Sequence, residues 1–146
     1  MYDDLYRSLY EIFTFFNRPQ QDTLLLRASG VSLDTALFPL VNRIAHSSRI
    51  GIVELAAEVD RHYSTVSRQV DRLVERGLVE RIEEGGDRRT RKIALTAAGK
   101  AMTERISKAR EAAMDEALRT WTREELIVLE TSLDHLARTL RDLRIR

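Results

Sequence analysis

Apolar residues recur at helical spacing between Tyr2 and Asn17, near the start of the chain. They are Leu5, Leu9, Ile12, Phe13 and Phe16. Residues that recur in this way share one face of a helix, so the pattern predicts an amphipathic helix. Arg18-Pro19 is expected to end it. Residues 20–30 contain the run TLLLRASG, which fits either a further helix or a short buried strand.

A second helical pattern follows through Leu37, Leu40, Val41 and Ile44. Ser32 or Asp34 is expected to cap this helix, because short oxygen-bearing side chains accept the free N–H groups of a first turn. Pro39 lies inside the pattern. It either kinks the helix or marks its true start, since proline has no N–H to donate.

The middle of the chain reads as two short helices followed by two strands. The apolar positions of the helices are Ile52, Leu55, Ala56 and Val59, then Val66, Val70, Leu73 and Val74. Residues 60–62 form a tight connection, and Gly77 suits the left-handed position after a helix. LVERIEE and RKIALT then read as a β-hairpin around Gly85-Gly86. Helix, turn, helix and hairpin is the order of a winged helix-turn-helix.

Two long helices are expected after the hairpin. Thr96 caps the first, and Thr122 with Glu125 forms a capping box for the second, with Trp121 and Leu126 at the positions of a hydrophobic staple. The last helix carries a heptad-like stripe made of Leu126, Leu129, Leu133, Leu136, Leu140 and Leu143. We expect this stripe to join Leu5 and Leu9 in a two-fold dimer. The alternative is that it is buried within one chain.

Composition narrows the possible classes. The length of 146 residues suits a single domain, and no apolar run is long enough for a membrane span. The start has no signal-peptide pattern. Without cysteine the chain has no disulfide, thiolate ligand or thiol switch, and a cytoplasmic location is expected.

The sequence offers no set of residues that predicts catalysis, a metal or a cofactor. His46, His62 and His135 have no ligand spacing, and Gly85-Gly86 is explained by turn chemistry rather than by a phosphate loop. Ser64 and Ser67 have no nearby base. We therefore expect a protein that is not an enzyme and has neither metal nor cofactor.

Local charge points instead to nucleic acid. The net charge is only +1, but residues 61–92 hold nine Lys or Arg against six Asp or Glu. The second short helix carries hydroxyls and cations suited to phosphates and base edges: Ser64, Thr65, Ser67, Arg68, Gln69 and Arg72. Alternatively this is a solvated face, with Ser64 or Ser67 as helix caps.

The hairpin tip strengthens the DNA interpretation. It carries Arg88, Arg89, Arg91 and Lys92, as expected of a wing that lies along DNA with an arginine in the minor groove. Asp87 is explained if it pairs with Arg89 and holds that side chain in position.

These residues together resemble the MarR family of bacterial transcription regulators. The resemblance rests on VELAAEVDRHYSTVSRQVDRL, RGLVER, the Asp87-x-Arg89 wing and LTAAGK, which cover about a third of the chain. It implies a mainly α (α+β) fold, with a winged helix-turn-helix core at about 33–96. Residues 1–18 and 97–146 would be dimerisation helices, all within one domain spanning 1–146.

The resemblance also implies a function. Family contacts with DNA would fall on Ser64, Thr65, Ser67 and Arg68, and the wing pair on Asp87 and Arg89. Members are usually homodimeric repressors of a pseudo-palindromic operator, and many release double-stranded DNA when a small aromatic ligand binds. Five aromatic residues could line such a pocket or belong to the core: Tyr6, Tyr10, Phe13, Phe16 and Phe38. The competing class is a winged-helix protein-interaction module without DNA binding.

Overall fold

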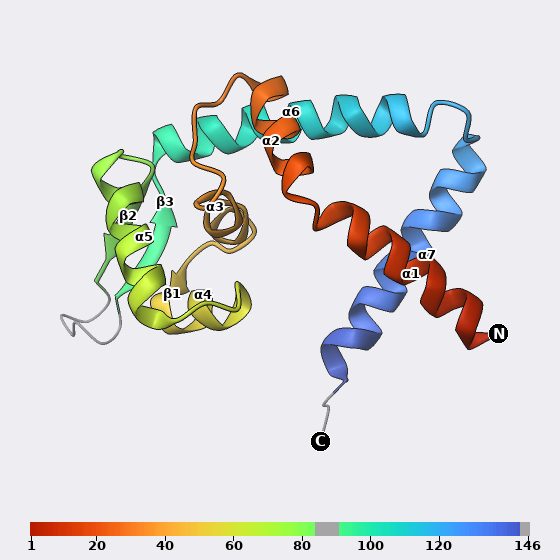
Figure 1. The fold of residues 1–146 in the computed structure, drawn as a ribbon, viewed down its shortest axis with the longest axis horizontal. Coiled ribbons are helices and arrows are strands. Elements are labelled where there is room, and N and C mark those ends of the chain that lie inside the picture. The colour runs from red at the N-terminus through yellow and green to blue at the C-terminus, as the bar shows by residue number, and fades with distance from the viewer. Residues whose placement is uncertain (84–90, 144–146) are drawn as a thin grey trace. The chain divides into compact units, whose positions relative to one another are not determined.

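The computed structural model describes residues 1–83 and 91–143 (Figure 1). The chain divides into two compact units, Met1–Arg110 and Glu111–Arg146, and each is described by itself. The elements are α1 (Tyr2–Phe16), α2 (Pro19–Ser29), α3 (Phe38–Ala45), β1 (Ile50–Gly51), α4 (Ile52–Glu58), α5 (Tyr63–Glu75), β2 (Val79–Ile82), β3 (Lys92–Leu95), α6 (Ala97–Ala117) and α7 (Arg123–Asp142). This is the mainly α winged helix-turn-helix that the sequence predicts.

The first helix ends as expected, and the stretch that the sequence left open is a helix. Pro19 lies in the first turn of α2, where the missing N–H of proline leaves no helical hydrogen bond unmade. Gly30 ends α2 in the left-handed region, at φ 67°. Leu26 of α2 is buried against Phe38 and Ile106.

The expected cap of the third helix was wrong. The N-cap of α3 is Leu37, which makes no side-chain cap bond, and Pro39 lies in the first turn. Pro39 therefore marks where the helix begins and does not kink it. Asp34 instead closes a local turn, because its Oδ1 accepts the Ala36 N–H at 2.9 Å.

The helix-turn-helix is built from α4 and α5. Asp60 occupies the left-handed region at φ 52°, which aspartate tolerates better than most residues, and the Arg61 N–H returns to the Ala56 carbonyl at 3.0 Å. Val66, Val70 and Leu73 of α5 are fully buried. Gly77, at φ 71°, follows this helix as the sequence predicts.

Three antiparallel strands complete the winged unit in the order β1-β3-β2. The predicted hairpin is confirmed in register, with Val79 opposite Leu95 and Arg81 opposite Ile93. The strand β1, where Ile50 pairs with Ile93, was not predicted from the sequence. Figure 1 shows α5 beside β2, in keeping with the contacts between these two elements.

A single cluster of aliphatic side chains joins these elements. It consists of Leu37, Leu40, Val41, Ile44, Ile50, Leu55, Ala56, Val66, Val70, Leu73, Leu78, Val79 and Ile93. Full burial of one such leucine, isoleucine or valine contributes about 1.5–3 kcal/mol. The cluster therefore fixes the orientation of α5 relative to the sheet.

The C-terminal helices follow their predicted signals. Thr96 Oγ1 accepts the Gly99 N–H at 3.1 Å, which caps α6. In the capping box of α7, the Glu125 N–H donates to Thr122 Oγ1 at 3.2 Å and the Thr122 N–H donates to Glu125 Oε2 at 2.7 Å.

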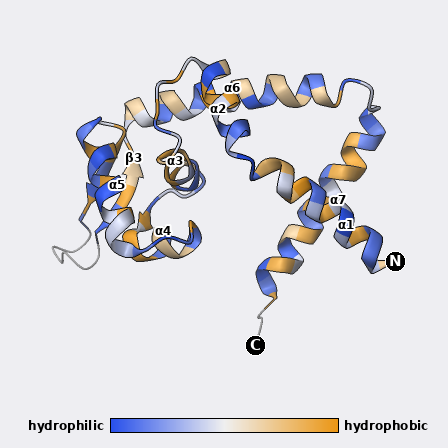
Figure 2. Cartoon of the chain, viewed as in Figure 1, coloured by the Kyte–Doolittle hydropathy of each residue, from blue (hydrophilic) through white to orange (hydrophobic). Residues whose placement is uncertain are grey.

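Hydrophobic and hydrophilic residues alternate along α7 (Figure 2). Among the described residues, no helix is long and apolar enough to cross a membrane.

Candidate nucleic-acid interface

The helix α5 has three distinct surfaces around its buried side. Ser64, Arg68 and Glu75 lie opposite the core and are exposed. Thr65 and Gln69, which are half-buried, share one flank with Arg72. The other flank carries Tyr63, Ser67 and Asp71 and lines a groove beside the hairpin. This separation follows from the 100° turn per residue of an α-helix.

The hydroxyls of α5 are available to a ligand. The N-cap is His62, with no side-chain cap bond, so Ser64 and Ser67 are not the caps of this helix. Within residues 1–83 and 91–143, no hydrogen bond is made by the side chains of Ser64, Thr65 or Ser67. Small hydroxyls at the start of a helix allow the close approach of a phosphate or a base edge.

Arg68 is the exposed cation on the side of α5 opposite the core. In the described part of the chain its guanidinium makes no hydrogen bond or ion pair. An unpaired arginine keeps all its donors for a ligand, and its planar fork matches the O6 and N7 atoms of guanine.

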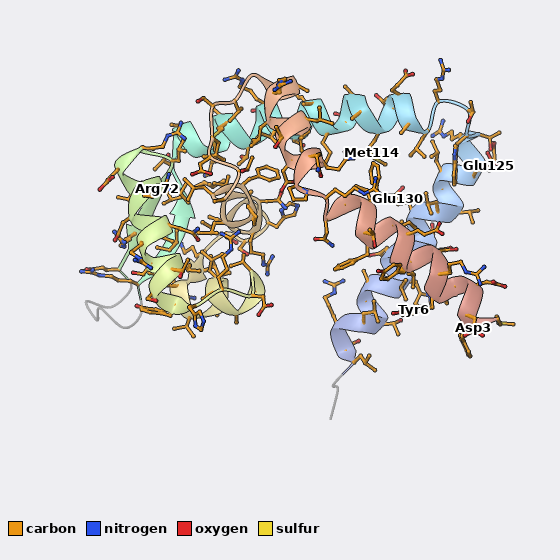
Figure 3. The ribbon with its side chains drawn as sticks, in the orientation of Figure 1. Asp3, Tyr6, Arg72, Met114, Glu125 and Glu130 are labelled. Atoms are coloured by element: carbon orange, nitrogen blue, oxygen red, sulfur yellow. The ribbon has the colours of Figure 1, made fainter. Side chains whose placement is uncertain are left out.

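Arg72 is in a different situation. Its Nη2 lies 3.1 Å from Asp34 Oδ2, and both side chains are about half exposed. The Ala36 N–H, followed by the Arg72 guanidinium, lowers the pKa of the Asp34 carboxyl below its usual value, so Asp34 is ionised at neutral pH. Figure 3 labels Arg72 on α5. The sequence could not indicate this pair, because its members are separated by 38 positions.

A groove of about 670 Å³ lies between α5 and the root of the hairpin. Its lining includes Tyr63 and Ser67 of α5 and Arg91 and Lys92 beside the wing. Of the expected site residues, the structure therefore brings Ser67 and Arg91 to one concave surface.

Carboxylates hold one arginine in a strand of the hairpin and another just before a strand. Arg81 of β2 donates to Asp71 of α5, a contact that the sequence analysis did not identify. Arg91 pairs with Glu83, with Nη2 2.6 Å from Oε1. Such pairs fix the direction of a guanidinium, as the sequence predicts for Asp87 and Arg89. That predicted pair, with Arg88, lies outside the described residues.

A smaller groove, of about 310 Å³, lies between α3 and α6. Phe38 lines it, whereas the aromatic residues of α1 do not. Tyr6, Tyr10, Phe13 and Phe16 are 59–70 % exposed. Arg110, also in the lining, donates to Asn42 Oδ1 at 3.2 Å. Of the five aromatic residues that could line a pocket or belong to the core, Phe38 is the one that lines this groove.

The described residues offer no cluster that suits a metal. Residues 1–83 and 91–143 contain no group of three or more His, Cys, Asp or Glu side chains that could hold an ion.

Comparison with known proteins identifies solved structures that have a similar architecture. Residues 33–96 match a family model described as HVO_A0114. No curated protein sequence matches the chain. Among solved structures, a MarR family protein from Bacillus stearothermophilus is 21% identical, covering 97% of this chain and 99% of its own, with a TM-score of 0.77; this likeness shows the fold.

Two further structures are similar at higher identity. Wild-type MarR from E. coli in its apo form is 26% identical over 90% of this chain and 96% of its own, with a TM-score of 0.66. A structure described as the multiple antibiotic resistance repressor MarR is 25% identical over 90% and 94%, with a TM-score of 0.68. The chain therefore has the fold of MarR-family proteins. Its similarity to these structures supports a winged-helix transcription regulator.

Proposed function

We propose that this protein is a MarR-type regulator, a homodimeric repressor that binds a pseudo-palindromic operator in double-stranded DNA. The observation that carries the DNA-binding part is the exposed surface of α5. Among the described residues, its hydroxyls make no hydrogen bond and Arg68 has no partner, and it adjoins a groove lined by Arg91 and Lys92 of the hairpin. A recognition helix in the major groove with a wing on the backbone uses this combination.

Individual roles follow from the surface on which each residue lies. Ser64, Thr65 and Ser67 would contact phosphates or base edges, and Arg68 would bind guanine. Arg91, beside the groove, would contact the backbone together with Arg88. Arg89 would enter the minor groove, held there by Asp87. Repression is proposed because a similar structure carries the description of a repressor.

Unburied apolar faces support the homodimer. In the described chain neither α1 nor α7 has a buried residue. Leu5, Leu133, Leu140 and Leu143 are 46–59 % exposed, while Leu9, Leu126, Leu129 and Leu136 are half-buried. Apolar stripes of this length are normally covered, and helices from both chain ends of a second copy can cover them.

The proposed arrangement assigns each part of the single domain a role. The winged core, at about 33–96, would bind DNA, and residues 1–18 and 97–146 would form the dimer. Two-fold symmetry would then set the two recognition helices into successive major grooves about 10 bp apart, which explains a palindromic site.

A selection from random duplexes tests DNA binding and identifies the preferred sequence in the same experiment. The protein should enrich an inverted repeat and bind it far more tightly than a scrambled duplex of the same composition. Arg68→Ala should reduce this preference, with a loss of about 1–3 kcal/mol on the selected duplex. Lys108→Ala is the matched control, since it also removes one cation but from an exposed position on α6. If no duplex is bound even at low salt, the protein-interaction alternative is supported instead.

Release by a small aromatic ligand is the finer part of the proposal. The groove between α3 and α6 supports it, because Phe38 supplies an apolar wall and Arg110 a cation. A small aromatic acid such as benzoate is the appropriate probe. Its addition should dissociate the selected duplex from the wild type at lower concentrations than from Arg110→Gln.

A further inference from the structure

Arginines from the rest of the winged unit bind the connector between α2 and α3 (residues 30–37). Their contacts fall at every second residue of the connector. Arg105 donates to the Gly30 carbonyl at 3.0 Å, and Arg76 donates to the Ser32 carbonyl at 2.6 Å. Arg72 binds Asp34. Arg61 donates to the Ala36 carbonyl at 2.7 Å.

Of these four contacts, only the one at Asp34 uses a charged side chain of the connector. The other three arginines bind backbone carbonyls, which carry no net charge. These arginines therefore keep their positive charge near the helix-turn-helix. Asp34 instead neutralises its arginine. Its position is fixed as well, because Oδ1 accepts the Ala36 N–H while Oδ2 faces Arg72.

Arg72 lies next to the proposed DNA-contacting surface. It is one helical turn after Arg68, displaced towards the connector flank of α5. An arginine at this position could contact a DNA phosphate if it had no carboxylate partner. Non-specific affinity for DNA depends almost entirely on such phosphate contacts, whereas base contacts provide the discrimination.

We propose that Asp34 is a specificity-determining residue, which acts by withholding Arg72 from DNA phosphates. With Arg72 paired, Arg68 is the arginine of α5 that has no partner in the described part of the chain, and binding is limited to sequences that Arg68 and the wing recognise. The carboxylate thus competes with phosphate for the same guanidinium. This inference rests on the proposed DNA-binding function, and it changes the role expected for Arg72 from a DNA contact to a withheld cation.

Asp34→Asn tests the proposal with little disturbance of the fold, because asparagine retains the Oδ1 acceptor for the Ala36 N–H. Binding of the selected and scrambled duplexes is measured over a range of salt concentrations. We expect affinity for the scrambled duplex to rise roughly two- to fivefold, the range spanned by a surface ion pair. The slope of log K against log[salt] should steepen by about 0.9, as for one added phosphate contact. The ratio of selected to scrambled affinity should fall.

A double-mutant cycle isolates Arg72. Arg72→Gln alone should leave the salt slope of the wild type unchanged. The double variant Asp34→Asn/Arg72→Gln should lose the increased affinity for the scrambled duplex and the steeper slope. Glu75→Gln is the charge-matched control, because it removes one negative charge from α5 without releasing an arginine from any described carboxylate. It should not reproduce the change in slope. Thermal melts of each variant establish that it is folded.

Three results would overturn the inference while leaving DNA binding intact. The salt slope could be the same in Asp34→Asn as in the wild type. Alternatively, the increased affinity for the scrambled duplex could persist in the double variant. Asp34→Asn could also weaken both duplexes, which would mean that Asp34 orients Arg72 towards DNA. A wild type that binds no duplex would instead refute the proposed function, and this inference with it.

Discussion

Gly99 allows α6 to pack directly on the backbone at the root of the hairpin. It is buried, and the neighbouring Thr96 N–H donates to the Leu78 carbonyl at 3.1 Å. A Cβ at position 99 would overlap the Leu78 carbonyl oxygen, and would lie 3.1 Å from its carbon and 3.2 Å from Leu95 Cδ2. The blocking atoms are backbone and cannot rotate away. Gly99→Ala must therefore displace α6 or the strand.

Two opposing effects set the size of the change. Alanine is favoured over glycine in a helix interior by up to about 1 kcal/mol. Overpacking a core costs about 1–3 kcal/mol, and a collision with backbone belongs at the upper end. The net loss should be about 2 kcal/mol in the free energy of unfolding. For a chain of this size that corresponds to a fall of roughly 4–8 °C in Tm.

The assay is thermal and urea unfolding followed by circular dichroism, at one fixed protomer concentration because a dimer's stability depends on it. Ala101→Gly is the matched control. It makes the reverse exchange at an exposed position of α6, and so measures helix propensity without the collision. A Gly99→Ala protein as stable as the wild type, beside a destabilised Ala101→Gly, would show that α6 does not approach Leu78 in this way.

Three further predictions concern the wing, the dimer and acid stability. Arg89→Ala should weaken operator binding by about 1–3 kcal/mol, and Asp87→Ala should also weaken it despite removing a negative charge; tighter binding by Asp87→Ala in a gel shift would refute the orienting role. Leu133→Glu should shift sedimentation from twice 16.8 kDa towards the monomer and reduce operator affinity, whereas a wild type already monomeric at micromolar concentration would rule out the dimer. Burial raises the pKa of Asp22, partly offset by Arg110, so its ionised form destabilises the fold above that pKa. Asp22→Asn should therefore raise Tm at neutral pH, and thermal melts should show the gain disappearing as the pH falls through the raised pKa; a gain independent of pH would contradict this cause.

The sequence predicted those helix ends that are determined by residues close together in the chain. The capping box at Thr122 and Glu125 and the left-handed Gly77 are fixed by residues within a few positions of each other. The run TLLLR was ambiguous, because a short apolar segment suits a buried strand or a helix equally well. Pro19 could have favoured the helix, since proline is common in the first helical turn. The two-residue β1 has no sequence signal, because its pairing with Ile93 is long-range.

The wrong prediction of a cap for α3 and the unpredicted ion pair between Asp34 and Arg72 have the same physical origin. Asp34 was expected to accept N–H groups of a helix, and it does accept a backbone N–H, but within the turn before the helix. Its second oxygen then faces Arg72, far away in sequence. Residue type predicts that an aspartate here will bind a donor. Only the tertiary fold determines which donors it finds.

If the proposed function holds, paired arginines would also explain how a chain with a net charge of only +1 selects its DNA sequence. Around α5 and the hairpin, carboxylates hold Arg72, Arg81 and Arg91, whereas Arg68 has no such partner among the described residues. Each pair would reduce the attraction for phosphate in general but leave Arg68, the arginine proposed to read bases, unaffected. In the proposed interface, selectivity would therefore depend on which cations are neutralised as much as on which are present. A count of basic residues along the sequence would overstate the charge offered to DNA.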